Sequence, residues 1–378
     1  MRTILLALLL MLLTGCAHAE DALTLQAVNV GKADALILRS GGDTYLIDTG
    51  TEESWGRLSR ALHSQGIDHL TGVIVTHTDS DHAGGAAALA QSSIEVGTWY
   101  ASCWYTCKES KHPVIRAAAL RGQKVVWLSA GDALSLDSGT LAVIGPTAED
   151  PDKENNNSLV LLAEKDGVRL LLAGDMEFPE EKLLLAQRLI PACDVLKVGN
   201  HGEDDATSIA LVEAVQPRLA VISTNTEEEP DTPSARVMKL LARAGAQVWQ
   251  TQDAEAGVLV TVSGGTAGAT YASTPVLPEK TAGMVIVDKG GDDTIRLRND
   301  SAGTIDLTDW FIRSERGGEI FVFPRDALVE PGQVITVVSQ SSEGSGDFIW
   351  PDTKVWHKSK EDRAVLCDSY GREMACME

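Results

Sequence analysis

Short apolar runs alternate with polar or glycine-rich breaks over the first two thirds of the chain. Runs of branched apolar residues predict strands, and apolar residues spaced three to four positions apart predict helices. Strands are expected at residues 23–30, 35–39, 44–47, 73–76, 95–101, 124–128, 160–163, 168–173, 195–198, 219–223, around 248 and at 258–262. Helices are expected at residues 55–64, 85–90, 114–120, 179–189 and 234–244. Strands that come first in runs and then alternate with helices indicate an α/β protein whose sheets are covered by helices.

The pattern changes at residue 264. Residues 264–283 are rich in Gly, Ala, Thr, Ser and Pro without an apolar period, which predicts a linker. Beyond it, short runs at 294–297, 319–323 and 333–338 are separated by turn residues, which predicts a small β-sandwich. We therefore expect two domains, at residues 20–263 and 284–378, after an N-terminal segment of residues 1–19.

The N-terminal segment has the features of an export signal. Arg2 precedes an apolar run at residues 4–13, which is too short to span a bilayer permanently. The run ends at Leu13-Thr-Gly-Cys16, which resembles the lipobox of bacterial lipoproteins, where the cysteine is lipid-modified. That resemblance implies an exported protein anchored through Cys16, and Ala17 after it favours the outer membrane, facing the periplasm or the cell surface. In the alternative, the chain is cleaved at Ala17-His-Ala19 and released as a soluble periplasmic or secreted protein.

An exported chain permits disulfides. We expect local pairs, Cys103 with Cys107 and Cys367 with Cys376, and a buried free thiol at Cys193. The alternative is that Cys103 and Cys107 form half of a zinc site, although no second Cys/His pair with suitable spacing follows.

The formal net charge of −22 is unusually negative. Nucleic acid and anionic lipid both require a cationic surface, so this charge opposes non-specific binding to either. A polyanionic substrate would need local positive charge, which a bound metal ion can supply.

One motif concentrates metal-binding side chains. A predicted strand at 73–76 leads into His77-Thr-Asp79-Ser-Asp81-His82, and the break Gly84-Gly85 follows. Alternate side chains of an extended chain point the same way, so the first three can converge beyond the strand end. Two imidazoles and two carboxylates suit Zn²⁺ best, with Mn²⁺ or Fe²⁺ as alternatives. The competing interpretation is a solvated acidic loop that happens to contain two histidines.

Three other polar residues follow predicted strands: Asp48, Asp175 and His201. Ligands of open α/β sheets collect at the carboxyl ends of strands. The motif and these three strand ends are therefore expected to meet in one cleft.

With these residues in place, residues 22–263 resemble the metallo-β-lactamase superfamily, and within it the hydrolase domain of ComEC-type competence proteins. The matching segments are Val30-Gly-Lys-Ala-Asp34-Ala, Ile47-Asp-Thr-Gly50, His77 to Gly85, Asn156-Asn-Ser-Leu-Val160, Gly174-Asp-Met176 and Leu196-Lys-Val-Gly-Asn-His-Gly202. The resemblance implies an αββα sandwich with a metal site at one edge.

The resemblance also implies two divalent metal ions, with Zn²⁺ or alternatively Mn²⁺ as the cofactor. By position, the ligands would be His77 and Asp79 for one ion, Asp81 and His82 for the other, Asp175 as the bridging carboxylate and His201 as a late ligand. Asp79 or Asp81 is the candidate to orient the attacking water. Lys197 could hold a phosphate oxygen; alternatively it is a solvated charge at a strand end. Four further residues are expected to support the ligands or nearby loops without binding metal: Asp34, Asp48, Asn157 and Asn200.

This chain departs from the family pattern at three positions. It has Asn200-His201 where the branch carries two histidines, Glu203 where the branch has Ser, and Thr232 where the branch has His. Asn is a poor zinc ligand and Thr is none at neutral pH. We therefore expect one metal position to be weaker, or filled by a harder ion such as Mn²⁺.

The C-terminal part resembles the lamin-tail domain, an immunoglobulin-like β-sandwich. The segments that carry this resemblance are Ile295-Arg-Leu-Arg-Asn299, Ile305 to Arg313, Phe323-Pro324, Leu328 to Gly332 and Asp362 to Gly371. Trp310 is expected to fill the core of the sandwich. The region has no metal or nucleophile constellation, so we expect it to be adhesive or substrate-presenting, with a partner at the surface or in the envelope.

Three functions are compatible with the sequence. The first is metal-assisted hydrolysis of a phosphodiester such as extracellular DNA, because a bound metal lowers the pKa of its water toward ~7. The second is hydrolysis of another ester, an amide or a thioester, since this fold hosts many reactions. The third is a surface binding protein whose metal site is structural or vestigial.

Overall fold

The computed structural model describes residues 22–290, 293–342, 344–357 and 361–377. The predicted signal segment and Cys16 lie outside these residues. Within the described part, no helix combines the length and the apolar composition needed to cross a membrane.

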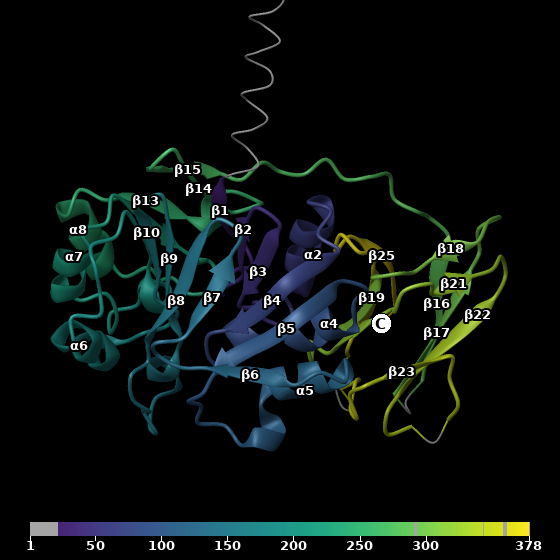
Figure 1. Cartoon of the computed structure of the whole chain (residues 1–378). Coiled ribbons are helices and arrows are strands. Elements are labelled where there is room, and N and C mark those ends of the chain that lie inside the picture. The colour runs from purple at the N-terminus through teal and green to yellow at the C-terminus, as the bar shows by residue number, and fades with distance from the viewer. Residues whose placement is uncertain (1–21, 291–292, 343, 358–360, 378) are drawn as a thin grey trace, which may run out of the picture.

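Two mixed sheets form the centre of the larger domain (Figure 1). In spatial order, the first sheet contains β15 (Thr266–Tyr271), β14 (Val258–Ser263), β1 (Leu23–Ala27), β2 (Leu36–Ser40), β3 (Asp43–Ile47), β4 (His69–Val75), β5 (Glu95–Ser102) and β6 (Val125–Leu128). The second contains β13 (Gln247–Gln250), β12 (Leu219–Ile222), β11 (Val195–Lys197), β10 (Val168–Leu172), β9 (Val160–Lys165), β8 (Gly139–Gly145) and β7 (Ala133–Leu136). Their facing sides share one apolar core, in which Leu38 and Ile74 of the first sheet accompany Leu161 and Leu170 of the second.

Helices cover the two outer faces, which completes the expected helix–sheet–sheet–helix layering (Figure 1). The first sheet is covered by α2 (Trp55–Ser64), α4 (Ala86–Gln91) and α5 (Pro113–Leu120), and the second by α6 (Phe178–Ala186), α7 (Ile209–Val215) and α8 (Ala235–Arg243). Helix α2 presents Trp55, Leu58 and Leu62 to the core, because apolar residues three to four apart share one helix face. The described residues also contain a one-turn α-helix, α3 (Ser80–Ala83), and short 3₁₀ helices: η1 (Glu109–Lys111), η2 (Glu154–Asn157), η3 (Gly199–Gly202) and η4 (Thr251–Asp253).

The structure differs from the expected linker at its start. Strand β15 lies inside residues 264–283 and pairs antiparallel with β14, with Thr266 opposite Ser263 at one end and Tyr271 opposite Val258 at the other. A tight turn through Gly264 and Gly265, both with positive φ, reverses the chain between the two strands. The small side chains of residues 266–271 do not prevent a strand here, because a strand at the edge of a sheet pairs with a single neighbouring strand.

The C-terminal domain is a β-sandwich around its own core. One sheet contains β16 (Met284–Gly290), β17 (Thr294–Asn299), β22 (Val334–Ser339) and β23 (Phe348–Trp350); the other contains β20 (Ile320–Val322), β19 (Phe311–Ser314), β24 (Ala364–Cys367) and β25 (Glu373–Met377); and β18 (Ile305–Asp306) pairs with β21 (Leu328–Val329). Trp310 is 6% exposed and packs within this core, as predicted.

The outer side of this sandwich shares a core with the larger domain. Phe311, Ile320 and Val322 belong to the same buried cluster as Trp55 of α2 and Leu89 of α4. Arg60 of α2 donates to the Tyr370 carbonyl, and the Asp309 carboxylate accepts from the backbone and hydroxyl of Ser93. The C-terminal domain is therefore packed against the helices that cover the first sheet.

The expected disulfides are not present. All five cysteines in the described residues are free thiols, including the predicted buried Cys193. Cys367 is buried and Cys376 is exposed; across the strands Cys376 pairs with Val365, and Cys367 pairs with Glu373. The pairing of Cys367 with Cys376 and of Cys103 with Cys107 was therefore wrong for this structure.

Candidate metal centre

The predicted motif forms the turn between β4 and the short helix α3. Asp79 lies in extended conformation immediately before α3, and His82 lies inside it. The backbone of His82 is held from behind, because its carbonyl accepts from both the amide and the hydroxyl of Thr49. The loop after β3 therefore fixes the direction in which His82 points.

Two glycines allow this close approach. A Cβ on Gly84 would lie 2.6 Å from the backbone nitrogen of Glu52, and a Cβ on Gly85 would collide with the Thr49 carbonyl oxygen. Real Cβ contacts are essentially never that short. The Gly-Gly break is thus required by the packing of α3 against the loop after β3.

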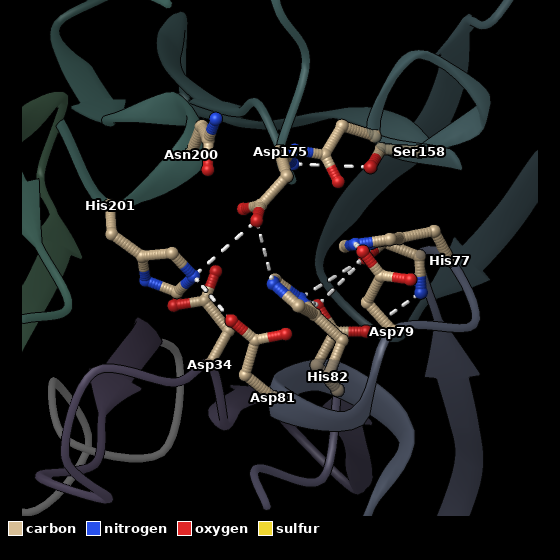
Figure 2. A network of polar contacts seen from close by, with 12 residues as sticks. Asp34, His77, Asp79, Asp81, His82, Ser158, Asp175, Asn200 and His201 are labelled. Carbon is tan, nitrogen blue, oxygen red and sulfur yellow. Dashed lines mark hydrogen bonds and ion pairs between the residues drawn. The ribbon is translucent and has the colours of Figure 1, made fainter. Parts of the chain in front are cut away.

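Four predicted ligands come together in one cluster: Asp81, His82, Asp175 and His201, whose ligand atoms all lie within 4.8 Å of one another. Asp175 lies between the two imidazoles, with its Oδ2 3.1 Å from His82 Nε2 and 3.4 Å from His201 Nε2 (Figure 2). Asp81 Oδ2 is also 3.4 Å from His201 Nε2. These side chains come from strand ends in both sheets, as the position of polar residues along the chain predicted.

The hydrogen bonds of the histidines leave the same nitrogen available in each. His82 Nδ1 lies 2.8 Å from Asp48 Oδ2, and His201 Nδ1 lies 2.9 Å from the Ser223 carbonyl. Both partners are acceptors, so Nδ1 carries the proton in each ring. This arrangement turns Nε2 toward the centre of the cluster, where a metal ion would take the place of a proton on that nitrogen; metal-binding histidines are held in this way in proteins.

A cation is the simplest explanation for several unpaired atoms. The Nε2 atoms of His77, His82 and His201 and Oδ1 of Asp175 are buried without a well-formed hydrogen bond, and only carboxylate oxygens lie near Nε2 of His82 and His201. Unsatisfied buried polar atoms are costly and rare in native proteins. Two imidazole nitrogens and two carboxylates around one point are a donor set that Zn²⁺ or Mn²⁺ accepts, so the residues fit a divalent ion.

The charges in the cluster are strongly coupled. Burial disfavours the ionised form of Asp175, but the charges of His82 and His201 outweigh it and hold its pKa well below the usual value. Burial likewise disfavours charged His201, yet Asp175 and Asp81 raise its pKa to about 9. The centre therefore favours positive charge, whether from protons or from a metal ion.

His77 and Asp79 lie beyond His82 and outside the four-ligand cluster (Figure 2). The ring of His77 is 4.1 Å from that of His82, and its Nε2 is 3.7 Å from Asp79 Oδ2. The Asp79 side chain is 48% exposed, whereas His77 is buried. The structure thus assembles one four-residue position and, next to it, a sparser pair; their role as ligands of another ion stays a prediction.

Asp48 and Asp34 lie next to His82, and the three form a further group whose ligand atoms lie within 4.8 Å of one another; that the two carboxylates support the ligands without binding metal stays a prediction. Asp48 accepts hydrogen bonds from the backbone amide and hydroxyl of Thr76 as well as from His82, so it orients a ligand directly. Asp34 is 1% exposed and also lies within reach of His82 and Asp48. Burial disfavours its ionised form, but Lys197 lowers its pKa.

The two asparagines support loops. Asn157 accepts from the amide of Asp150 and donates to its carbonyl, which closes the loop before β9. Asn200 donates to Asp205, and its backbone has positive φ, as does that of His201. Two consecutive non-glycine residues in the left-handed region are strained, and such strain is typical of functional sites. Here it turns the His201 ring into the cluster.

The predicted contact between Lys197 and a phosphate oxygen is wrong for this structure. Lys197 is 1% exposed, and its Nζ lies 2.7 Å from Asp34 Oδ2 and 3.1 Å from the Val198 carbonyl. An ammonium group buried in an ion pair cannot reach a substrate without breaking that pair. The alternative of a solvated charge is also excluded by the burial.

Neither Asn200 nor Thr232 belongs to the four-ligand cluster, and the expected weakening of one metal position stays a prediction. Thr232 is buried, and its carbonyl accepts from the hydroxyl of Thr224. His201 remains in the cluster. The sparser part of the centre is at His77 and Asp79. The family pattern alone did not reveal this, because a sequence motif does not say how exposed each side chain is.

Lys32 was not among the predicted site residues. Its Nζ lies 3.6 Å from Asp81 Oδ2 and 2.9 Å from Glu203 Oε1. Lys32 is two positions before Asp34, inside a segment that carried the family resemblance, so its positive charge could have marked it as a candidate site residue. Ser223, which orients His201 through a backbone carbonyl, left no sequence signal.

Comparison with known proteins identifies a family for each of the two domains. Residues 28–226 match the family model of the metallo-beta-lactamase superfamily, and residues 281–378 match that of the Lamin Tail Domain. ComE operon protein 3 of Bacillus subtilis is 28% identical over 254 residues, which cover 62% of this chain and 32% of that protein. Recombination protein 2 of Haemophilus influenzae is 27% identical over 231 residues, which cover 59% and 27%. The chain thus spans about a third or less of the curated relatives it matches.

Among solved structures, the metallo-beta-lactamase fold protein YhfI of Bacillus subtilis aligns with a TM-score of 0.43 at 10% identity, over 64% of this chain and 100% of that one. The family model covers more than half of this chain and includes the motif and its surrounding strand ends. The chain therefore belongs to the metallo-beta-lactamase superfamily.

Proposed function

We propose that this protein is a metal-dependent hydrolase that cleaves phosphodiesters, with DNA outside the cytoplasm as the expected substrate. The observation that carries the proposal is the set of buried, unpaired Nε2 atoms of His82 and His201 facing the carboxylates of Asp81 and Asp175. Such a set is built to bind a cation, and the fold to which it belongs hosts hydrolases.

The residues of the chain divide the remaining work. A divalent ion in the cluster would supply Lewis acidity and a water of lowered pKa. Asp79 is half-exposed and close to His77, so its carboxylate would orient a water and accept its proton when the second metal position is empty and Asp79 is not itself a ligand. Asp48 keeps His82 in the tautomer that a metal requires.

We expect two ions. One would be held by Asp81, His82, Asp175 and His201, whose ligand atoms lie within 4.8 Å of one another. The second would be held by His77 and Asp79, with Asp175 as the expected bridging carboxylate. Because the second position has fewer ligands and borders solvent, we expect it to bind more weakly. Zn²⁺ is the expected metal, with Mn²⁺ as the alternative.

The choice of DNA rests on the relatives. One of them is named a recombination protein and another a competence protein, Competence protein ComA of Neisseria gonorrhoeae, which is 25% identical over 239 residues. The net charge of −22 opposes DNA binding, so attraction must come from the metal centre itself. Export and lipidation at Cys16 would place the enzyme in the envelope, with the C-terminal domain free to contact an envelope or surface partner through its other faces.

The test combines metal analysis with turnover. Protein lacking residues 1–19 is expected to retain bound metal through purification and to cleave bis(p-nitrophenyl) phosphate and DNA when assayed with Zn²⁺, Mn²⁺ or Mg²⁺. His82→Ala should lose both metal and activity, while Lys239→Gln, an exposed change on α8, should lose neither. Unchanged turnover in His82→Ala would contradict the proposal.

One observation favours a second candidate, the hydrolysis of an uncharged ester, amide or thioester. Asp81, Glu203 and Glu229 all contact Lys32 and are partly exposed to solvent; this exposed side of the centre, here called the opening, is therefore acidic. A panel of neutral and anionic substrates at one metal concentration separates the two functions. Metal binding without turnover of any substrate would instead support a binding protein.

A further inference from the structure

Lys32 lies at the opening of the candidate metal centre, on the loop between β1 and β2. Its ammonium group contacts three carboxylates: Glu203 at 2.9 Å, Glu229 at 3.5 Å and Asp81 at 3.6 Å. The Lys32 side chain is 18% exposed, against 1% for Lys197. Lys32 therefore borders both a candidate metal ligand and solvent, which Lys197 does not.

The backbone of Lys32 is fixed from a second loop. Its amide donates to Glu228 Oε2 at 2.7 Å, and Glu228 Oε1 accepts from Asn225 at 2.8 Å. The preceding Gly31 has φ +93, and the Glu228 carboxylate lies 2.7 Å from where a Cβ would be. Only glycine allows this approach, so the position of the lysine is set by two loops and not by its side-chain pairs alone.

The carboxylate partners differ in how firmly they hold the ammonium group. Asp81 belongs to the metal cluster, so its charge would be shared with a bound ion. The side chains of Glu203 and Glu229 are 30% and 47% exposed. Exposed ion pairs are weak, so an anionic ligand at the opening can replace either glutamate. A lysine ammonium group is a cation at neutral pH, so Lys32 offers a positive charge to whichever anion replaces a glutamate.

We propose that Lys32 binds an anionic oxygen of the substrate beside the metal centre, and that Glu203 and Glu229 compete with the substrate for its ammonium group. This inference rests on the proposed function for its substrate class, a phosphodiester. It assigns to Lys32 the contact that the buried Lys197 cannot make. It also explains how an acidic opening admits an anion: the substrate exchanges with carboxylates that already occupy the cation.

Removing the ammonium group and removing one of its carboxylate partners should change KM in opposite directions. With bis(p-nitrophenyl) phosphate, Lys32→Gln is expected to raise KM about tenfold with little change in kcat, because it removes a contact made equally by bound substrate and transition state. Glu229→Gln is expected to lower KM about threefold, because it frees the ammonium group. Lys32→Arg should retain most of the affinity, and with the neutral ester p-nitrophenyl acetate all KM values should stay within about twofold.

A binding measurement keeps the inference separate from the proposed function. Calorimetric titration of inorganic phosphate into metal-loaded protein requires no turnover. The expected order of affinity is Glu229→Gln above wild type above Lys32→Gln, with equal metal content in all three and with Lys239→Gln equal to wild type.

Equal phosphate affinity in wild type and Lys32→Gln would overturn the inference. So would a loss of affinity in Glu229→Gln, because it would mean that the ion pairs only hold the loops together. If the wild type turns over no substrate while phosphate binding follows the expected order, the proposed function fails and Lys32 remains an anion-binding residue.

Discussion

The histidines of the metal centre depend on single hydrogen bonds for their tautomer. Asp48 accepts from His82 Nδ1 and is 1% exposed, so no water can substitute for it. Residues behind metal ligands contribute about 10–100-fold to metal affinity. The chemistry of the centre is therefore set as much by Asp48 and the Ser223 carbonyl as by the ligands.

Asp48→Asn should lower the affinity for Zn²⁺ by about 10–100-fold without unfolding the protein. The amide keeps the shape of the side chain but can donate to His82 Nδ1, which favours the tautomer with its proton on Nε2. Competition with a chelator measures the change, and circular dichroism checks the fold. Asp253→Asn, at an acidic residue of η4, is the control; equal affinity in both variants would contradict the assigned role of Asp48.

Asp79→Asn should separate the two metal positions. The variant is expected to keep the first equivalent of metal, which its four ligands hold, and to lose most of the affinity for the second. Calorimetric titration of metal-free protein gives both stoichiometries. Loss of the first equivalent in Asp79→Asn would show that Asp79 belongs to the four-ligand position.

For single residues, the sequence predicted which side chains converge better than it predicted how exposed each side chain is. The motif and its strand ends predicted the residues that converge, because strand periodicity and topology fix where they emerge. The burial of Lys197 and the exposure of Lys32 could not be predicted, since each depends on residues more than 160 positions away, such as Asp34 for Lys197.

The helices α2 and α4 serve both domains at once. They cover the first sheet on one side and contact β19 and β20 of the C-terminal domain on the other. Phe311 of β19 and the Gly371 backbone each lie 3.2 Å from the position that a Cβ on Gly56 of α2 would take, so a side chain there would have to displace its neighbours by a few tenths of an ångström. The boundary between the domains is thus a packed core and not only a tether.

Phe311→Ala should destabilise both domains together. The residue is 2% exposed, and truncating a buried phenylalanine costs about 3–5 kcal/mol of unfolding free energy. Because its neighbours belong to α2 and α4, urea unfolding followed by the tryptophans of both domains should show one shifted transition.

Ile349→Ala is the matched control, since Ile349 is 63% exposed and its loss should change the free energy by less than about 0.5 kcal/mol. If Phe311→Ala shifted only a separate transition of the C-terminal domain, the two domains would not share a core. Sequence alone predicted many elements from their own periods but missed β7, β8, α7 and β15. It did not predict this contact either, because an apolar face does not specify its partner.

The whole molecule carries a charge of −22, and some of that charge is enclosed where the domains meet. The Glu52 carboxylate accepts from the Ile320 amide across the domain contact. Burial and the negative charges of Asp352, Glu319 and Glu53 raise the pKa of Glu52 to about 8. The domain contact therefore favours the protonated form of this side chain.

The free energy of unfolding should fall as pH rises from about 4.5 to about 8. In that range the folded state keeps the proton of Glu52 and the unfolded state does not, so raising the pH favours unfolding. Glu52→Gln should flatten this part of the profile, whereas Glu213→Gln, on the exposed face of α7, should leave it intact. Urea unfolding at several pH values tests both; an equally steep profile in Glu52→Gln would contradict the role of Glu52.

The sequence by itself determined the fold class, the family and the ligand types, because apolar periodicity and strand-end motifs are local properties that survive in the linear order of residues. Only the tertiary structure decided which ligands share one position, which lysine is buried and which faces the opening, and that the C-terminal domain shares a core with α2 and α4. These outcomes depend on burial and on contacts between distant segments, and neither is encoded at any single position of the chain.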